Sequence, residues 1–287
     1  MASPAVSPAG SITTCGKSRV GVELRFPSVF LALAGACVLV QAQDGAAVAA
    51  PETQSSPKVP VVAIIDSGVA RTPELRNVLL EEYDFGASPA RPAFRPRYDH
   101  GTMVATIMER EAKEPIYIIS FRIDDLEGCP KEVNPPCQHD VRPIAAAIRK
   151  ATELGVTAIN ISLNLKEDPL IVDAIRDASA RGIRVIMAAG NDGLDHPGNL
   201  RMAKAGYPNT ILVGALDADG QPWKGTNRPQ PDTPGYRYVW QWGVDVPTIM
   251  ADGTRAIATG TSFAAPIETA KLLTQSQQPP ATIALSS

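Results

Sequence analysis

The sequence predicts an α/β fold of three layers, in which helices flank a mostly parallel, twisted β-sheet. The apolar runs at 61–65 and within 183–189 are typical of buried strands, and a further strand is expected at 156–162. Stretches with the helical spacing of apolar residues stand between such runs, at 143–154 and 169–181. Because strands and helices alternate along the chain, we expect a parallel sheet with helices on both faces.

The remaining elements follow from similar signals. Asp168 and Pro169 supply a cap and a first-turn proline for one helix, and Gly155 and Gly182 follow two helices as stop signals. The stretch 217–238 is rich in Pro, Gly and Asn and is expected to be a long loop. Further strands are expected at 116–121 and 211–216, and further helices from His100 and at 261–273.

Composition fits one globular domain, which we expect to span residues 59–275. The chain has 287 residues, of which 44% are hydrophobic and 20% charged, and this is an ordinary profile for a soluble fold. The formal charge of −3 and the lack of a basic patch argue against a nucleic-acid partner.

The N-terminus is typical of an exported protein. Basic residues precede an apolar run at 26–40, and the small residues after it suit cleavage, so we expect a signal peptide at 1–42. The region before the run is long, which also fits a misassigned start. The run is short for a stable membrane span, although a tether through 26–40 or a lipid on Cys37 is the alternative. We expect a linker at 43–58, a polar tail at 276–287, and a secreted or periplasmic location.

Export makes disulfides favourable. Cys129 and Cys137 bracket a short Pro-containing segment and are a plausible pair in an oxidising compartment. Their spacing is not that of a zinc site, and we expect no metal there.

Four polar residues stand where reactive groups are expected. Ser262 begins a predicted helix, where unpaired N–H groups favour negative charge, but Gly-Thr-Ser is also an ordinary helix cap. Asp66 follows the strand 61–65, and Asn191 follows the strand 183–189; each also fits a turn. His100 stands at a helix start, and a lone histidine is more often structural.

The order Asp66, His100, Asn191, Ser262 makes the pattern more specific, since Asp before His before Ser is one of the known orders of a catalytic triad. The boxes Ile-Ile-Asp-Ser-Gly, His-Gly-Thr, Ala-Gly-Asn and Gly-Thr-Ser-Phe-Ala-Ala-Pro contain these residues, and Thr-Ala-Ile-Asn-Ile-Ser-Leu lies at 157–163. Together they resemble the motifs of the subtilisin-like serine proteases, the subtilases. The resemblance extends from about Val59 to Leu273.

The resemblance implies a role for each residue. Ser262 would attack a peptide carbonyl, His100 would carry the proton, Asp66 would orient His100, and Asn191 would donate to the oxyanion. The segment Ser162, Leu163 and Asn164 would pair with an extended peptide, and the segment Ala188, Ala189 and Gly190 would line a substrate pocket. Asn164 departs from the glycine that is common in the family. The resemblance implies a peptide or protein substrate and no cofactor.

The alternative function is a module of the same fold that binds peptides or partners with little turnover. A lipase or esterase fits less well, because Gly-Thr-Ser-Phe-Ala lacks the Gly-x-Ser-x-Gly elbow.

Overall fold

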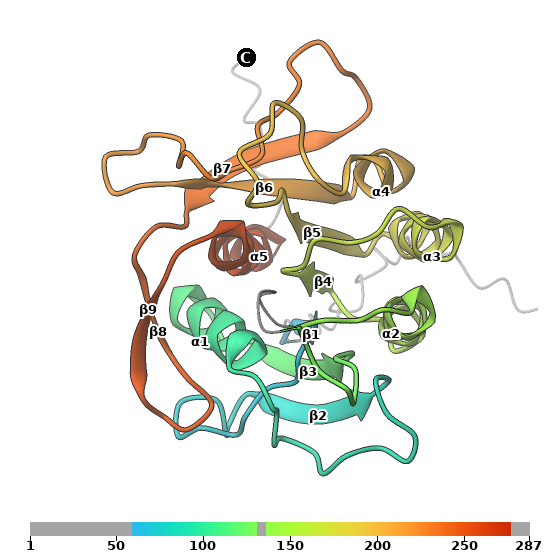
Figure 1. The fold of residues 1–287 in the computed structure, drawn as a ribbon, viewed down its shortest axis with the longest axis vertical. Coiled ribbons are helices and arrows are strands. Elements are labelled where there is room, and N and C mark those ends of the chain that lie inside the picture. Colours follow the sequence, from blue (N-terminus) through green and yellow to red (C-terminus); the bar gives the residue numbers. More distant parts are fainter. Residues whose placement is uncertain (1–58, 131–135, 277–287) are drawn as a thin grey trace, which may run out of the picture. The chain divides into compact units, whose positions relative to one another are not determined.

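The computed structural model describes residues 59–130 and 136–276. Its centre is a seven-stranded parallel sheet in the order β2-β3-β1-β4-β5-β6-β7 (Figure 1). The sheet's strands are β1 (Val61–Asp66), β2 (Leu79–Asp84), β3 (Tyr117–Arg122), β4 (Ala158–Ile161), β5 (Arg184–Ala188), β6 (Thr210–Leu216) and β7 (Arg237–Trp242). The predicted three-layer fold with a mostly parallel sheet is confirmed.

Helices cover both faces of this sheet (Figure 1). One face carries α2 (Val141–Glu153), α3 (Pro169–Ala180) and α4 (Leu200–Ala205), and the other carries α1 (His100–Glu111) and α5 (Thr261–Ser276). The antiparallel hairpin of β8 (Val246–Ile249) and β9 (Arg255–Ala258) packs beside α1.

The alternation of side chains along each strand divides the core into two halves. In β1, Ala63 and Ile65 pack toward α2 and α3, whereas Val62 and Ile64 pack toward α1 and α5. All four side chains are fully buried. A strand buried on both faces is apolar at most positions, which explains the continuous run that predicted β1.

Several elements were not anticipated. The expected loop 217–238 ends in β7, an edge strand that pairs in parallel with β6 and whose residues are mostly half-buried. Strand β2 forms the other edge and exposes Leu80 and Glu81. Edge strands lack the apolar run that marked the central strands. The short helix α4 and the β8–β9 hairpin were also missed.

Other expectations concern parts of the chain outside the described residues. These are the signal peptide at 1–42 with its alternatives at 26–40 and Cys37, the linker at 43–58, and residues 277–287 of the tail. Helix α5 continues to Ser276, the first residue of the expected tail. None of the helices within 59–130 and 136–276 has the length and apolarity that crossing a membrane would require.

Candidate active site

The C-terminal end of β1 lies next to the start of α1 and brings Asp66 and His100 together. Asp66 is the last residue of β1 and is fully buried, and His100 is the first residue of α1. The Nδ1 atom of His100 lies 2.9 Å from both carboxylate oxygens of Asp66. Burial alone would lower the pKa of His100, but the charge of Asp66 and its hydrogen bond raise that pKa above its ordinary value. Asp66 is therefore suited to orient the imidazole and to stabilise its charged form.

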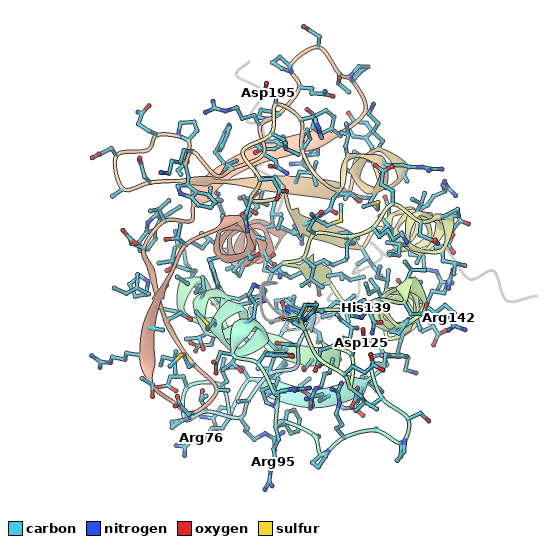
Figure 2. The ribbon with its side chains drawn as sticks, in the orientation of Figure 1. Arg76, Arg95, Asp125, His139, Arg142 and Asp195 are labelled. Atoms are coloured by element: carbon cyan, nitrogen blue, oxygen red, sulfur yellow. A yellow bond between two sulfur atoms is a disulfide. The ribbon has the colours of Figure 1, made fainter. Side chains whose placement is uncertain are left out.

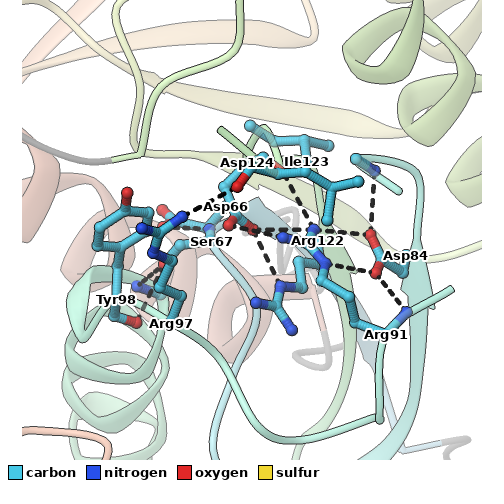
Figure 3. Close-up of polar contacts among 12 residues, drawn as sticks. Asp66, Ser67, Asp84, Arg91, Arg97, Tyr98, Arg122, Ile123 and Asp124 are labelled. Atoms are coloured by element: carbon cyan, nitrogen blue, oxygen red, sulfur yellow. Dashed lines mark hydrogen bonds and ion pairs between the residues drawn. The ribbon is translucent and has the colours of Figure 1, made fainter. Parts of the chain in front are cut away.

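Ser67 fixes the helix start against β1 (Figure 3). Its backbone N–H donates to Asp66 Oδ1 at 2.7 Å, and its hydroxyl donates to the Tyr98 carbonyl at 3.3 Å. The same hydroxyl accepts from the Gly101 N–H at 3.1 Å. Gly101 has to be glycine, because a Cβ there would lie 2.3 Å from the Gly68 carbonyl oxygen. Sequence reasoning missed this role of Ser67.

A mostly buried ionic network lies next to Asp66 and consists of Asp84, Arg91, Arg122 and Asp124 (Figure 3). Arg91 contacts Asp84 at 2.7 Å and Asp124 at 2.9 Å, and Asp124 also accepts from Arg122 Nε at 2.9 Å. In the β1–β3 register, Arg122 is the partner of Asp66. Although burial acts to raise the pKa of Asp84, the hydrogen bonds from Arg91 outweigh it and lower that pKa. The network ties the segment that leads to His100 to the end of the sheet.

Ser262 lies in the first turn of α5 and is nearly buried. Its hydroxyl donates to the backbone carbonyl of Ser162 at 2.9 Å, and the Ser162 hydroxyl donates to the Ser262 carbonyl at 2.8 Å. Within the described residues, no hydrogen bond joins Ser262 to His100. Both side chains nevertheless line the same cavity of about 830 Å³, and catalytic hydrogen bonds often form only when substrate is bound.

Asn191 faces this cavity with its side-chain amide held in one orientation. Its Oδ1 accepts from the Thr261 backbone N–H at 2.9 Å and from the Thr261 hydroxyl at 2.8 Å. The Nδ2 group has no acceptor among the described residues, and Asn191 is one of the residues that line the cavity. Gly260 has φ of +149°, and a Cβ there would lie 3.2 Å from Asn191 Nδ2, so a side chain would crowd this donor.

The two expected substrate segments differ in whether they line the cavity. Ser162, Leu163 and Asn164 line the cavity. Ala188, Ala189 and Gly190 are buried and are not among the residues that line it. The expected pocket at 188–190 therefore stays a prediction.

The side chain of Asn199, which sequence reasoning missed, forms hydrogen bonds to both of these segments. Its Nδ2 donates to the carbonyls of Leu163 and Ala188, both at 2.9 Å, and its Oδ1 accepts from the Leu165 N–H at 2.9 Å. Asn199 has a positive φ of 60°, a conformation that asparagine tolerates better than most residues. Its position in a Pro-Gly-Asn stretch was the only available signal.

The predicted disulfide between Cys129 and Cys137 is present, with the two Cα atoms 5.2 Å apart. Cys137 lines the cavity, and the Cys129 N–H donates to the Tyr98 hydroxyl at 3.0 Å. Beyond it, Asp125 pairs with His139 close to the start of α2 (Figure 2). The part of the chain that the structure describes holds no cluster of three or more His, Cys, Asp or Glu residues suited to a metal ion.

Comparisons with known proteins show which sequences this chain resembles. A 123-residue stretch is 31% identical to Subtilisin-like protease 10 of Trichophyton verrucosum (strain HKI 0517), covering 41% of this chain and 22% of that protein. A 160-residue stretch is 29% identical to Alkaline elastase YaB of Bacillus sp. (strain YaB), covering 54% and 39%. The matched regions thus span well under half the length of either curated relative.

Solved structures give the same fold. A cold-adapted subtilisin-like serine proteinase matches with a TM-score of 0.62 at 17% identity, covering 76% of this chain and 75% of that one. The S41 psychrophilic protease matches with a TM-score of 0.59 at 25% identity, covering 76% and 78%. The sequence model of the subtilase family, peptidase S8, matches residues 58–281. This chain therefore belongs to the subtilase family.

Proposed function

We propose that this protein is a serine endopeptidase in which Ser262 is the nucleophile, His100 the general base and Asp66 the residue that orients His100. The observation that carries the proposal is the bidentate contact of His100 with buried Asp66, at 2.9 Å, in the cavity that Ser262 also lines. Asn191 and the backbone N–H of Ser262 would hold the oxyanion, and the fixed orientation of the Asn191 amide supports this role.

The reaction follows from these groups. Ser262 Oγ turns from the Ser162 carbonyl toward His100, which takes its proton as Oγ bonds to the peptide carbonyl carbon. Charge moves to the carbonyl oxygen, next to Asn191 Nδ2. His100 then gives its proton to the amine that leaves, and an acyl-enzyme ester remains. Water attacks the ester with the same proton transfers, and the acid is released.

The substrate would be a peptide or protein bound as an extended strand. Ser162, Leu163 and Asn164 would pair with its backbone, since this segment continues from β4 and lines the cavity. Ala188, Ala189 and Gly190 would bound the pocket for the residue before the cut. A secreted or periplasmic location, after removal of residues 1–42, belongs to the same proposal and rests on the sequence of the leader.

The decisive experiment is labelling with a serine-directed fluorophosphonate probe. We expect labelling of the purified wild type at Ser262, located by peptide mass spectrometry, and none in Ser262→Ala. His100→Ala should fold and label far more slowly. Ser179→Ala, which removes a buried hydroxyl elsewhere, is the matched control and should label normally. An unlabelled but folded wild type would instead favour the peptide-binding module.

A further inference from the structure

The helix that carries Ser262 has a gap in its backbone hydrogen bonding. Pro266 lies inside α5, four residues after Ser262. In a regular α-helix the N–H of residue 266 would donate to the carbonyl of residue 262, but proline has no N–H and its ring crowds that carbonyl. The Ser262 carbonyl therefore needs a donor from outside the helix, because unpaired buried carbonyls are costly.

The donor comes from the neighbouring strand. The Ser162 hydroxyl, just after β4, donates to the Ser262 carbonyl at 2.8 Å. A hydroxyl has one hydrogen, so this bond forms only if that hydrogen points at α5. Asn160 secures the direction, because its Nδ2 donates to Ser162 Oγ at 3.0 Å and leaves the hydroxyl hydrogen for Ser262.

The other end of the Asn160 amide contacts α5. Its Oδ1 accepts from the Thr269 hydroxyl at 2.9 Å, and the same hydroxyl also donates to the Ala265 carbonyl at 3.0 Å, so its one hydrogen is shared between two acceptors. Asn160, Ser162 and Thr269 are each at most 1% exposed. Asn160 stands in a strand whose other residues are apolar, so the packing of β4 does not account for a polar side chain there.

We propose that Asn160 is a positioning residue for the nucleophile, and that it acts through Ser162 to supply the hydrogen bond that Pro266 removes from α5. We call the two hydrogen bonds that run from Asn160 through Ser162 to Ser262 the relay. The relay fixes the helical turn that presents Ser262 Oγ and its N–H to the cavity. This inference rests on the proposed role of Ser262. A small displacement of that turn has a large effect, since about 1 Å of misplacement can cost on the order of 100-fold in rate.

The test restores the missing helix donor. Two variants are made, Asn160→Leu and the smaller change Ser162→Ala. Each is made both in the native protein and in a protein that carries Pro266→Ala. Ser179→Ala is the matched control for the loss of a buried hydroxyl. The rate of fluorophosphonate labelling and the melting temperature are measured for each. In the native background, we expect labelling to slow by about 10- to 100-fold. The Pro266→Ala change adds an N–H that can bond the Ser262 carbonyl, and in that background the loss should shrink to about twofold.

The outcomes separate the alternatives. The relay would be overturned if the labelling rate fell equally in both backgrounds, or if it fell in neither. Thermal unfolding gives an independent reading: Asn160→Leu should lower the melting temperature by several degrees more in the native background than in the Pro266→Ala background. If wild type is never labelled, the proposed function fails, while this difference in melting temperature still shows whether the relay replaces the missing bond. Ser162→Ala keeps the test decisive if Asn160→Leu does not fold.

Discussion

The hydroxyl of Ser262 rests on the backbone carbonyl of Ser162, at 2.9 Å, and not on His100. That carbonyl belongs to the segment that we expect to pair with a peptide backbone. A peptide N–H that arrives there competes with the Ser262 hydroxyl for the same acceptor. Binding of substrate should therefore help to turn the nucleophile toward His100.

This relationship predicts that a free amide N–H next to the reactive centre speeds acylation. A peptidyl phosphonate with that N–H should inactivate the protein up to about tenfold faster than its N-methyl analogue, because one hydrogen bond typically contributes a net of about 0.5–1.5 kcal/mol. Second-order inactivation rates measure the effect. Equal rates for the two compounds would contradict it, and a probe without any amide serves as the reference.

The pH dependence follows from the raised pKa of His100. Only neutral His100 can accept the serine proton, so the labelling rate should fall as the pH drops through a value above the ordinary 6.5. In Asp66→Asn, burial is no longer opposed by a negative charge, and the midpoint should move lower while the rate falls by about 10⁴-fold. A pH–rate profile of both proteins checks this, and an unchanged midpoint would argue against the pairing.

The same pair contributes to stability with a definite sign. Because the pKa of His100 is higher in the folded state, its protonated form stabilises the fold below about pH 6.5. This contribution is lost as the pH rises through the folded-state pKa. Urea unfolding at a series of pH values should show a smaller loss on raising the pH in Asp66→Asn than in the wild type.

Removing the Asn191 donor should impair turnover with little effect on KM. We expect Asn191→Ala to lower kcat by about 10²–10³-fold, which is the loss known for such a donor in a subtilisin and not a figure obtained from this structure. Steady-state kinetics on a peptide substrate measure it. A rise in KM at unchanged kcat would assign Asn191 to ground-state binding.

The buried ionic network should matter far more than exposed ion pairs. Asp124→Ala leaves Arg122 buried without its carboxylate, and we expect a loss of about 3–5 kcal/mol in the free energy of unfolding. Asp173→Ala breaks a pair in which both side chains are more than half exposed, and should cost at most about 0.5 kcal/mol. Similar losses in urea titrations would contradict this interpretation of the network.

The sequence predicted the elements that are buried on both faces and the residues at their ends. Strand β1 with Asp66 and strand β5 before Asn191 have continuous apolar runs, and helix α1 starts at His100. Strands β2 and β7 were missed because edge strands carry polar and half-buried residues. The partners of Asn160 and Asn199 lie in segments distant along the chain, and a single buried asparagine has no periodic signal.

The bond between Ser162 and Ser262 also bears on when the proposed nucleophile could first become reactive. The two residues are 100 positions apart in the sequence, and α5 is the last described helix of the chain. The Ser262 carbonyl receives no N–H from Pro266, so the hydrogen bond from Ser162 can form only once β4 lies beside α5. A chain still emerging from the ribosome, or one arrested part-way through folding, should therefore carry a serine that is no more reactive than any other.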